Sequence, residues 1–288
     1  MYKQYYNLES KPFSLLPDPK YLYLSSKHSL AYAMLEYGLT EETGGYAVIT
    51  GDIGAGKTTL LRKLINEIDS DVTIGFVSTT SEDFDELLAL ILSAFKLEFR
   101  SKSKIEKYQD LVQFIESQYK GNKRCVLVID EAQNISLETL EELRMLTNVN
   151  TEDGQKLQLV LSGQPGLLDK LKSPKLSQLA QRVSVQYNID SLSKEDCIEY
   201  VAHRLSVSGN DTKIFDDAAS IMIWYYSRGI PRVINSICDL AMVYGYAEQK
   251  QKISANIIKS VIQDRKNGGL FSDMSDVNKV EELLVSEI

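Results

Sequence analysis

Residues 46–61 read YAVITGDIGAGKTTLL, an apolar run that leads through a glycine-rich turn into a second apolar pattern. Residues 46–50 are apolar or β-branched, as in a buried parallel strand. Residues 59–65 place apolar side chains at helical spacing. The glycines therefore fall on a predicted strand-to-helix turn.

The turn matches the pattern G-x-x-x-x-G-K-[ST] of a phosphate-binding loop through Gly51, Gly56, Lys57 and Thr58. Its glycines let successive backbone N–H groups face a phosphate chain, and the following helix adds the positive end of its dipole. Lys57 would neutralise phosphate oxygens, and the Thr58 hydroxyl would ligate Mg²⁺. An accidental glycine-rich turn is the alternative, but it would not require the strand before and the helix after. The residues predicted to bind a nucleoside triphosphate are Gly51, Asp52, Ile53, Gly54, Ala55, Gly56, Lys57, Thr58 and Thr59.

A second candidate element is RCVLVIDEAQ, residues 124–133, in which an apolar run ends in Asp130 and Glu131. A carboxylate at the tip of a buried strand is costly unless it has a cation or a hydrogen-bond partner, and Mg²⁺ beside Thr58 supplies one. Asp130 is therefore predicted to be the Walker B aspartate and, with Thr58, a metal ligand. Glu131 would polarise the attacking water as general base. The alternative is that these two acids simply begin a loop.

The composition is that of an ordinary globular protein: 288 residues, 43% hydrophobic and 25% charged. The N-terminus has no basic segment followed by an apolar core, and no apolar run approaches the ~18 residues needed to span a bilayer. A cytoplasmic protein is expected. Cys125, Cys197 and Cys238 are widely spaced and odd in number, so we predict neither a disulfide framework nor a metal site formed by them. The net charge of −8 argues against a protein that works mainly by gripping nucleic-acid phosphates, while a local basic patch stays open.

Beyond the glycine-rich turn, short apolar runs alternate with helical patterns, which predicts an α/β fold with a mostly parallel sheet and helices on both faces. The expected strands are residues 72–77, 125–129, 157–161 and 183–187, and the expected helices are residues 83–95, 105–119 and 136–146. After residue 192 the strands stop and four amphipathic segments follow, which predicts a small all-helical domain.

Prolines 12, 17 and 19 rule out a continuous helix before Lys20, after which Ser25 or Ser26 can cap a helix through Tyr37. The acidic C-terminal stretch has apolar residues at spacings of three and four, which fits either a short docking helix or a frayed, solvated end. The expected parts are an N-terminal arm and helix, residues 1–45; a nucleotide-binding α/β domain, 46–191; a helical lid domain, 192–266; and the tail, 267–288.

Six segments together carry a family resemblance: GDIGAGKTTLLR, VLVIDEAQ, LVLSGQPGL, LAQRVSV, YVAHRL and GIPRVIN. Their combination resembles the AAA+ ATPases of the general secretion pathway protein A family, and the N-terminal arm strengthens the likeness, which covers residues 1–265. Within that family, the subset with this architecture and no membrane segment is similar to the secretion ATPases encoded with exopolysaccharide and exosortase systems. A more distant resemblance is to the transposition ATPases, which act on DNA.

The resemblance implies an AAA+ P-loop NTPase domain with a helical lid, binding ATP and Mg²⁺. It implies that Ser162 or Gln164 is the polar sensor near the γ-phosphate, with Gln164 favoured. Arg182, in LAQRVSV, matches the arginine that AAA+ rings offer to the neighbouring subunit's nucleotide, where a guanidinium would stabilise transition-state charge. Arg232, in GIPRVIN, matches the lid arginine that contacts nucleotide in cis; a helix-start arginine on a solvated face is its alternative.

The function implied is a Mg²⁺-dependent ATPase that oligomerises with ATP and powers or regulates an envelope secretion or exopolysaccharide export system. It would be cytoplasmic or peripheral at the inner membrane, with protein partners in that system, reached in part through the tail. One alternative is an ATP-dependent DNA-binding regulator resembling the transposition ATPases; another is a signalling switch timed by slow hydrolysis. Family members commonly continue into a membrane helix and a peptidoglycan-binding domain, whereas this sequence stops at Ile288, so no cell-wall role is expected. Relatives also commonly carry an acid where this chain has Gly166.

Overall fold

The structure is a computed structural model that describes residues 1–288 except 41–44, 69–70, 80, 151–153 and 268–288. By their contacts, the residues form two compact units. One unit contains Met1–Ser25, Ile53–Thr59 and Asp190–Ile288, and the other contains Ser26–Asp52 and Leu60–Ile189. The N-terminal arm thus packs with the C-terminal helices, and the helix after the arm packs with the sheet. The division into four parts expected from the sequence stays a prediction, and the tail from residue 268 lies outside the described residues.

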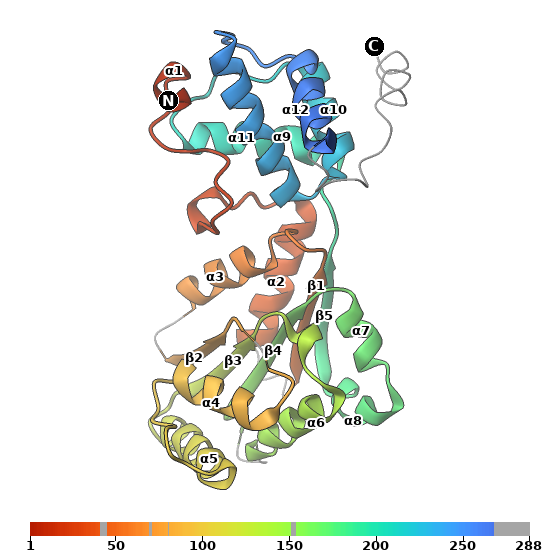
Figure 1. The fold of residues 1–288 in the computed structure, drawn as a ribbon. Helices are drawn as coiled ribbons and strands as arrows, with labels where there is room; N and C mark the ends of the chain where they lie inside the picture. The colour runs from red at the N-terminus through yellow and green to blue at the C-terminus, as the bar shows by residue number, and fades with distance from the viewer. Residues whose placement is uncertain (41–44, 69–70, 80, 151–153, 268–288) are drawn as a thin grey trace. The chain divides into compact units, whose positions relative to one another are not determined.

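Five parallel strands form the sheet of the second unit, in the order β2-β3-β4-β1-β5 (Figure 1). This order places β4 between the strand that leads into the phosphate loop and the strand that ends at Asp130. The strands are β1 (Tyr46–Gly51), β2 (Val72–Val77), β3 (Arg124–Ile129), β4 (Leu157–Gly163) and β5 (Val183–Ile189). The predicted α/β fold with a parallel sheet is confirmed, and β4 and β5 each run two residues further than the sequence pattern indicates.

Helices cover both faces of this sheet (Figure 1). They are α2 (Ser26–Thr40), α3 (Lys57–Glu67), α4 (Phe84–Ala94), α5 (Lys104–Lys120), α6 (Leu137–Leu146), α7 (Gly166–Leu171) and α8 (Ser177–Ala180), with short 3-10 turns η2 (Ala132–Asn134), η3 (Thr147–Val149) and η4 (Pro174–Leu176). Side-chain caps start several of them: Asp83 accepts from the Glu86 N–H, and Ser103 and Glu106 form a capping box. The sequence did not predict α7 or α8, which are only six and four residues long.

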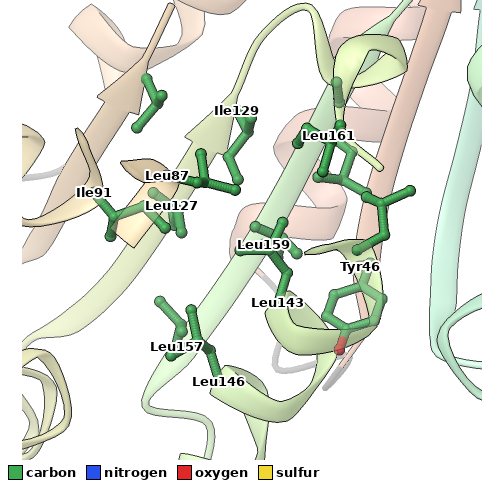
Figure 2. Close-up of a cluster of buried hydrophobic side chains, with 14 of the residues drawn as sticks. Tyr46, Leu87, Ile91, Leu127, Ile129, Leu143, Leu146, Leu157, Leu159 and Leu161 are labelled. Atoms are coloured by element: carbon green, nitrogen blue, oxygen red, sulfur yellow. The ribbon is translucent and has the colours of Figure 1, made fainter. Parts of the chain in front are cut away.

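The core of this unit follows the two-residue alternation of the strands. Leu127 and Ile129 of β3 lie on the face covered by α4 and α6, where they join Leu87, Ile91 and further leucines in one buried cluster (Figure 2). Residues of opposite parity face the other side, where α2 packs on β1 and β5. Burial on both faces explains why the three central strands β1, β3 and β4 read as nearly continuous apolar runs.

The other unit is helical. Its helices α9 (Lys194–Val207), α10 (Asp217–Ser227), α11 (Pro231–Ala247) and α12 (Ala255–Asn267) share one apolar core. Ser193 caps α9 by accepting the Asp196 N–H, and Asp216 caps α10 by accepting the Ala219 N–H. The cysteines at positions 125, 197 and 238 are buried and free. Burial raises the pKa of Cys125 and of Cys197 to about 12, so both thiols stay protonated at neutral pH.

The N-terminal arm is part of this helical core. It contains α1 (Tyr2–Tyr5) and the 3-10 turn η1 (Pro19–Tyr21), and its aromatic side chains are buried against α9 to α12. Arg204 of α9 is the main polar anchor. Its Nε donates to the carbonyl of Pro12, its Nη1 donates to the Tyr200 hydroxyl at 2.9 Å, and its guanidinium lies over the Tyr21 ring, 4.7 Å from the centroid.

Replacing Arg204 with methionine is expected to destabilise the helical unit by about 3 kcal/mol, because buried acceptors of Pro12 and Tyr200 lose their donor. The arm should then become sensitive to limited proteolysis at low protease concentration. The matched control is Lys252→Met, an exposed cation in the same unit. If Arg204→Met and Lys252→Met release the arm at the same rate, Arg204 is not its anchor.

Candidate active site

The carboxyl edge of the sheet gathers the polar residues that end β1, β3 and β4. Parallel pairing aligns Thr50 with Gly163 and Ile129 with Leu161, so these three strands finish side by side. Asp130 follows β3, and Ser162 and Gln164 lie at the end of β4. The sequence marks these positions one by one, and the strand order brings them to a single edge.

The glycine-rich turn leaves β1 at the same edge. β1 ends at Gly51 and α3 begins at Lys57, so the loop lies on a strand-to-helix turn as predicted. Gly54 and Gly56 have φ angles of +83° and +99°, a region that other residues rarely adopt. The Lys57 side chain is buried, and Thr58 is half-buried in the first turn of the helix. This backbone suits a loop whose N–H groups face an anion.

Gly54 is also in close contact with the start of helix α11. The Arg232 N–H donates to the Gly54 carbonyl at 3.3 Å, and a Cβ on Gly54 would collide with the Cβ of Arg232. The Arg232 side chain itself is exposed. The predicted contact between the Arg232 guanidinium and nucleotide stays a prediction, and the observed contact is made by its backbone.

We expect Gly54→Ala to weaken ATP binding about tenfold or more. An alanine at positive φ is strained by about 1–2 kcal/mol, and its methyl must displace the start of α11. The matched control is Gly166→Ala, because a Cβ at Gly166 meets no atom within 4 Å. Titration of a fluorescent ATP analogue measures both variants. Equal affinities for wild type, Gly54→Ala and Gly166→Ala would contradict a role for this close contact.

Asp130 is a buried carboxylate, 3% exposed. Its Oδ1 accepts from the Ser162 hydroxyl at 2.7 Å and from the Glu131 N–H at 3.0 Å. These bonds fix the carboxylate at the strand end. Oxygen ligands are what Mg²⁺ prefers, so the Asp130 carboxylate and the Thr58 hydroxyl are each of the right chemical type, and their joint binding of the ion stays a prediction. In the described part of the chain, no group of three or more His, Cys, Asp and Glu side chains could hold a metal ion.

Glu131, the predicted general base, has an unusual backbone. Its φ and ψ are 55° and 32°, the left-handed region, which costs a non-glycine residue about 1–2 kcal/mol. Such strain is often found where a side chain must be aimed. The Glu131 Oε2 accepts from Gln133 Nε2 at 2.7 Å. Gln133 is a residue of the site that the sequence did not single out.

The two sensor candidates differ in what they contact. Ser162 is fully buried and donates to Asp130. Gln164 is half-buried, and its backbone N–H donates to Gln133 Oε1 at 3.0 Å. The sequence favours Gln164 over Ser162, and that sensor role for its side chain stays a prediction. The hydrogen bond between Ser162 and Asp130 forms because β3 and β4 are neighbours in the sheet. No local sequence pattern indicates that they are.

Arg182 lies at the opposite edge of the sheet. It precedes β5, and its carbonyl accepts from the N–H of Tyr46, the first residue of β1. The exposed guanidinium donates to Thr147 Oγ1 at 2.9 Å and to Asn148 Oδ1 at 3.2 Å. A strand of six residues spans about 20 Å, more than an arginine side chain can reach. The structure therefore does not bring Arg182 together with Asp130 and Glu131 of the same chain.

Comparison with known proteins gives three kinds of likeness. Residues 40–171 match the family model of the AAA domain. Over 254 residues, 88% of this chain, the sequence is 39% identical to "General secretion pathway protein A" of Aeromonas hydrophila. The chain covers 46% of that protein, so it spans about half the length of the curated relative it matches.

Solved AAA+ structures share the fold. Cdc6p of Pyrobaculum aerophilum superposes with a TM-score of 0.66 at 16% identity, covering 86% of this chain and 71% of that chain. ORC1 of Aeropyrum pernix, solved in complex with DNA, gives 0.64 at 18% identity, covering 89% and 69%. RuvB of Thermotoga maritima gives 0.56 at 22% identity, covering 83% and 67%. At these identities the likeness shows the AAA+ fold alone, and it confirms the predicted fold class.

Proposed function

For this chain, a P-loop NTPase with an AAA domain that resembles general secretion pathway protein A, we propose a role as a Mg²⁺-dependent ATPase that oligomerises with ATP. In this role it powers or regulates an envelope secretion or exopolysaccharide export system. The observation that carries the proposal is the buried Asp130, bonded to Ser162 and followed by the strained Glu131, at the sheet edge from which the phosphate loop leaves.

Each residue of the site has one task in hydrolysis. Backbone N–H groups of residues 51–59 bind the phosphates, and Lys57 offsets their charge. Thr58 and Asp130 would hold Mg²⁺, which when bound neutralises charge on the phosphate oxygens. Glu131 accepts a proton from the water that attacks the γ-phosphorus, while the bond from that phosphorus to the bridging oxygen breaks and ADP leaves with the electron pair.

The position of Arg182 supports the proposed oligomerisation. A guanidinium stabilises the charge on the equatorial phosphate oxygens in the transition state, and it acts only within contact distance. Arg182 lies at the amino edge of the sheet, and Asp130 and Glu131 lie at the carboxyl edge, so a catalytic Arg182 must serve the nucleotide of another chain. In this proposal each active site is shared by two chains, and hydrolysis depends on assembly.

The link to export is supported by the relative from Aeromonas hydrophila, whose name assigns it to the general secretion pathway. We further propose that the system exports exopolysaccharide and that the chain is cytoplasmic or peripheral at the inner membrane. Its protein partners in that system would bind the tail. In the described part of the chain, no helix has the length and apolar character to cross a bilayer.

In the source organism, replacing the chain with its Lys57→Ala variant should stop export of the secreted polymer or protein. Unchanged export of both would contradict the proposal.

A mobility assay with labelled duplex DNA separates this proposal from a DNA-binding regulator. The net charge of −8 favours weak binding, because the electrostatic part of DNA affinity requires a basic surface. We expect no saturable shift with ATP and Mg²⁺ at physiological salt. A saturable shift that requires ATP would instead favour a filament on DNA.

A further inference from the structure

Gln133 joins the ends of two neighbouring strands through its side-chain amide. It lies in η2, two residues after Glu131, and is half-buried. Its Nε2 donates to Glu131 Oε2 at 2.7 Å, and its Oε1 accepts from the Gln164 N–H at 3.0 Å. We propose that Gln133 is a positioning residue that holds the Glu131 carboxylate and couples it to the end of β4. This inference rests on the proposed ATPase function.

The chemistry of the two contacts determines which way the amide faces. A backbone N–H can only donate, so the oxygen of the Gln133 amide must face Gln164. The amide nitrogen then faces Glu131, whose ionised carboxylate can only accept. A side chain with a donor and an acceptor on one planar group is needed here, and glutamine provides both. A carboxylate at position 133 would keep the bond to Gln164 and repel Glu131.

The backbone of β4 leaves room for this amide at Gly163. A Cβ at that position would lie 2.7 Å from Gln133 Oε1 and 3.2 Å from the backbone nitrogen of Gln133. Only a residue without a side chain therefore lets the amide approach the strand so closely. The fit of Gly163 to Gln133 is independent of the hydrogen bonds and points to the same arrangement.

Two side-chain connections join the ends of β3 and β4 in addition to the backbone hydrogen bonds between the strands. Ser162 holds Asp130, and the Gln164 backbone holds Glu131 through Gln133. A displacement of the β4 end at Gln164 thus moves the amide that aims the Glu131 carboxylate. Glu131 itself has a left-handed backbone, which is often found where a side chain must be oriented. The Gln133 side chain therefore orients the Glu131 carboxylate, and a shift of the end of β4 changes that orientation.

The first experiment replaces Gln133 with methionine, which keeps the length of the side chain and removes its hydrogen bonds to Glu131 and Gln164 together with a longer one, 3.5 Å, to Asn134 Oδ1. We expect turnover to fall on the order of tenfold or more, with unchanged affinity for ATP, because general-base catalysis depends on alignment. Gln113→Met, the same change at an exposed position of α5, is the control and should keep wild-type turnover. Normal turnover in Gln133→Met overturns the inference. A wild-type chain without ATPase activity overturns the proposed function, and the inference with it.

A double-mutant cycle separates positioning from general support of the fold. In a Glu131→Ala background, Gln133→Met should change the residual rate by less than about twofold, since there is no carboxylate left to orient. If the second substitution lowers the rate as much as it does in the wild type, Gln133 acts through the structure and not through Glu131.

The nucleotide-free protein offers a readout that does not depend on activity. A side-chain amide proton that donates to a carboxylate resonates downfield of a solvated one. We expect a Gln133 amide proton to move upfield in Glu131→Ala and the Gln164 backbone amide to exchange faster with solvent in Gln133→Met. Spectra in which neither signal changes would show that the bridge does not exist in solution.

Discussion

A Lys57→Ala chain is expected to bind no ATP, and a Glu131→Gln chain is expected to bind ATP and hydrolyse it at least about a hundredfold more slowly than wild type. Lys57 neutralises charge on the phosphates both in bound ATP and in the transition state, so its loss removes ATP binding. Glu131 acts on the water, and its amide form cannot accept the proton. The Glu131→Gln chain should therefore retain unreacted ATP through purification.

Equilibrium binding of a labelled nucleotide and single-turnover hydrolysis measure the two effects separately. Lys63→Ala is the matched control for Lys57→Ala, since it removes a lysine from the same helix that pairs with Glu67 at 2.5 Å on the surface. It should leave binding unchanged. Normal turnover in Glu131→Gln would remove this residue as the general base, and normal binding in Lys57→Ala would remove the phosphate loop from the nucleotide site.

Arg182→Ala should bind ATP with near-normal affinity and lose a factor on the order of a thousand or more in turnover, if Arg182 is supplied to the neighbouring chain as a full arginine finger. The guanidinium also bonds Thr147 and Asn148, so a purely structural role must be excluded. Asn148→Ala removes one of these partners at an exposed position and keeps the guanidinium. This control should turn over ATP at the wild-type rate.

Mixing two inactive variants tests the same proposal more sharply. A Glu131→Gln chain keeps Arg182, and an Arg182→Ala chain keeps Glu131. In mixed assemblies, some sites combine the intact Glu131 of one chain with the intact Arg182 of its neighbour, so part of the activity should return. A mixture as inactive as its components would place Arg182 in a cis or structural role.

The features that could be predicted from sequence are those that local patterns determine. The apolar run before Gly51 and the helical spacing after Thr58 locate the phosphate loop, and the apolar run before Asp130 locates the end of β3. These signals need only the neighbours along the chain. The sequence therefore predicts the strand-to-helix turn and the parallel α/β fold.

The features missed depend on segments distant in sequence. The hydrogen bonds from Ser162 to Asp130 and from Gln164 to Gln133 each join residues more than thirty positions apart. They follow from the adjacency of β3 and β4, for which the sequence offers a resemblance and no local signal. The packing of the arm on α9 through Arg204 is hidden for the same reason. Short helices such as α7 carry too few residues to show a helical period.

Turnover per chain, measured for the wild type across a wide range of protein concentration with saturating ATP and Mg²⁺, tests whether the active site is shared. If Glu131 of one chain works with Arg182 of another, the specific activity must rise with concentration until assembly is complete, so the total rate increases faster than linearly at low protein. A specific activity that is constant from the lowest to the highest concentration, in a protein that sediments as a monomer with ATP, would contradict the shared site.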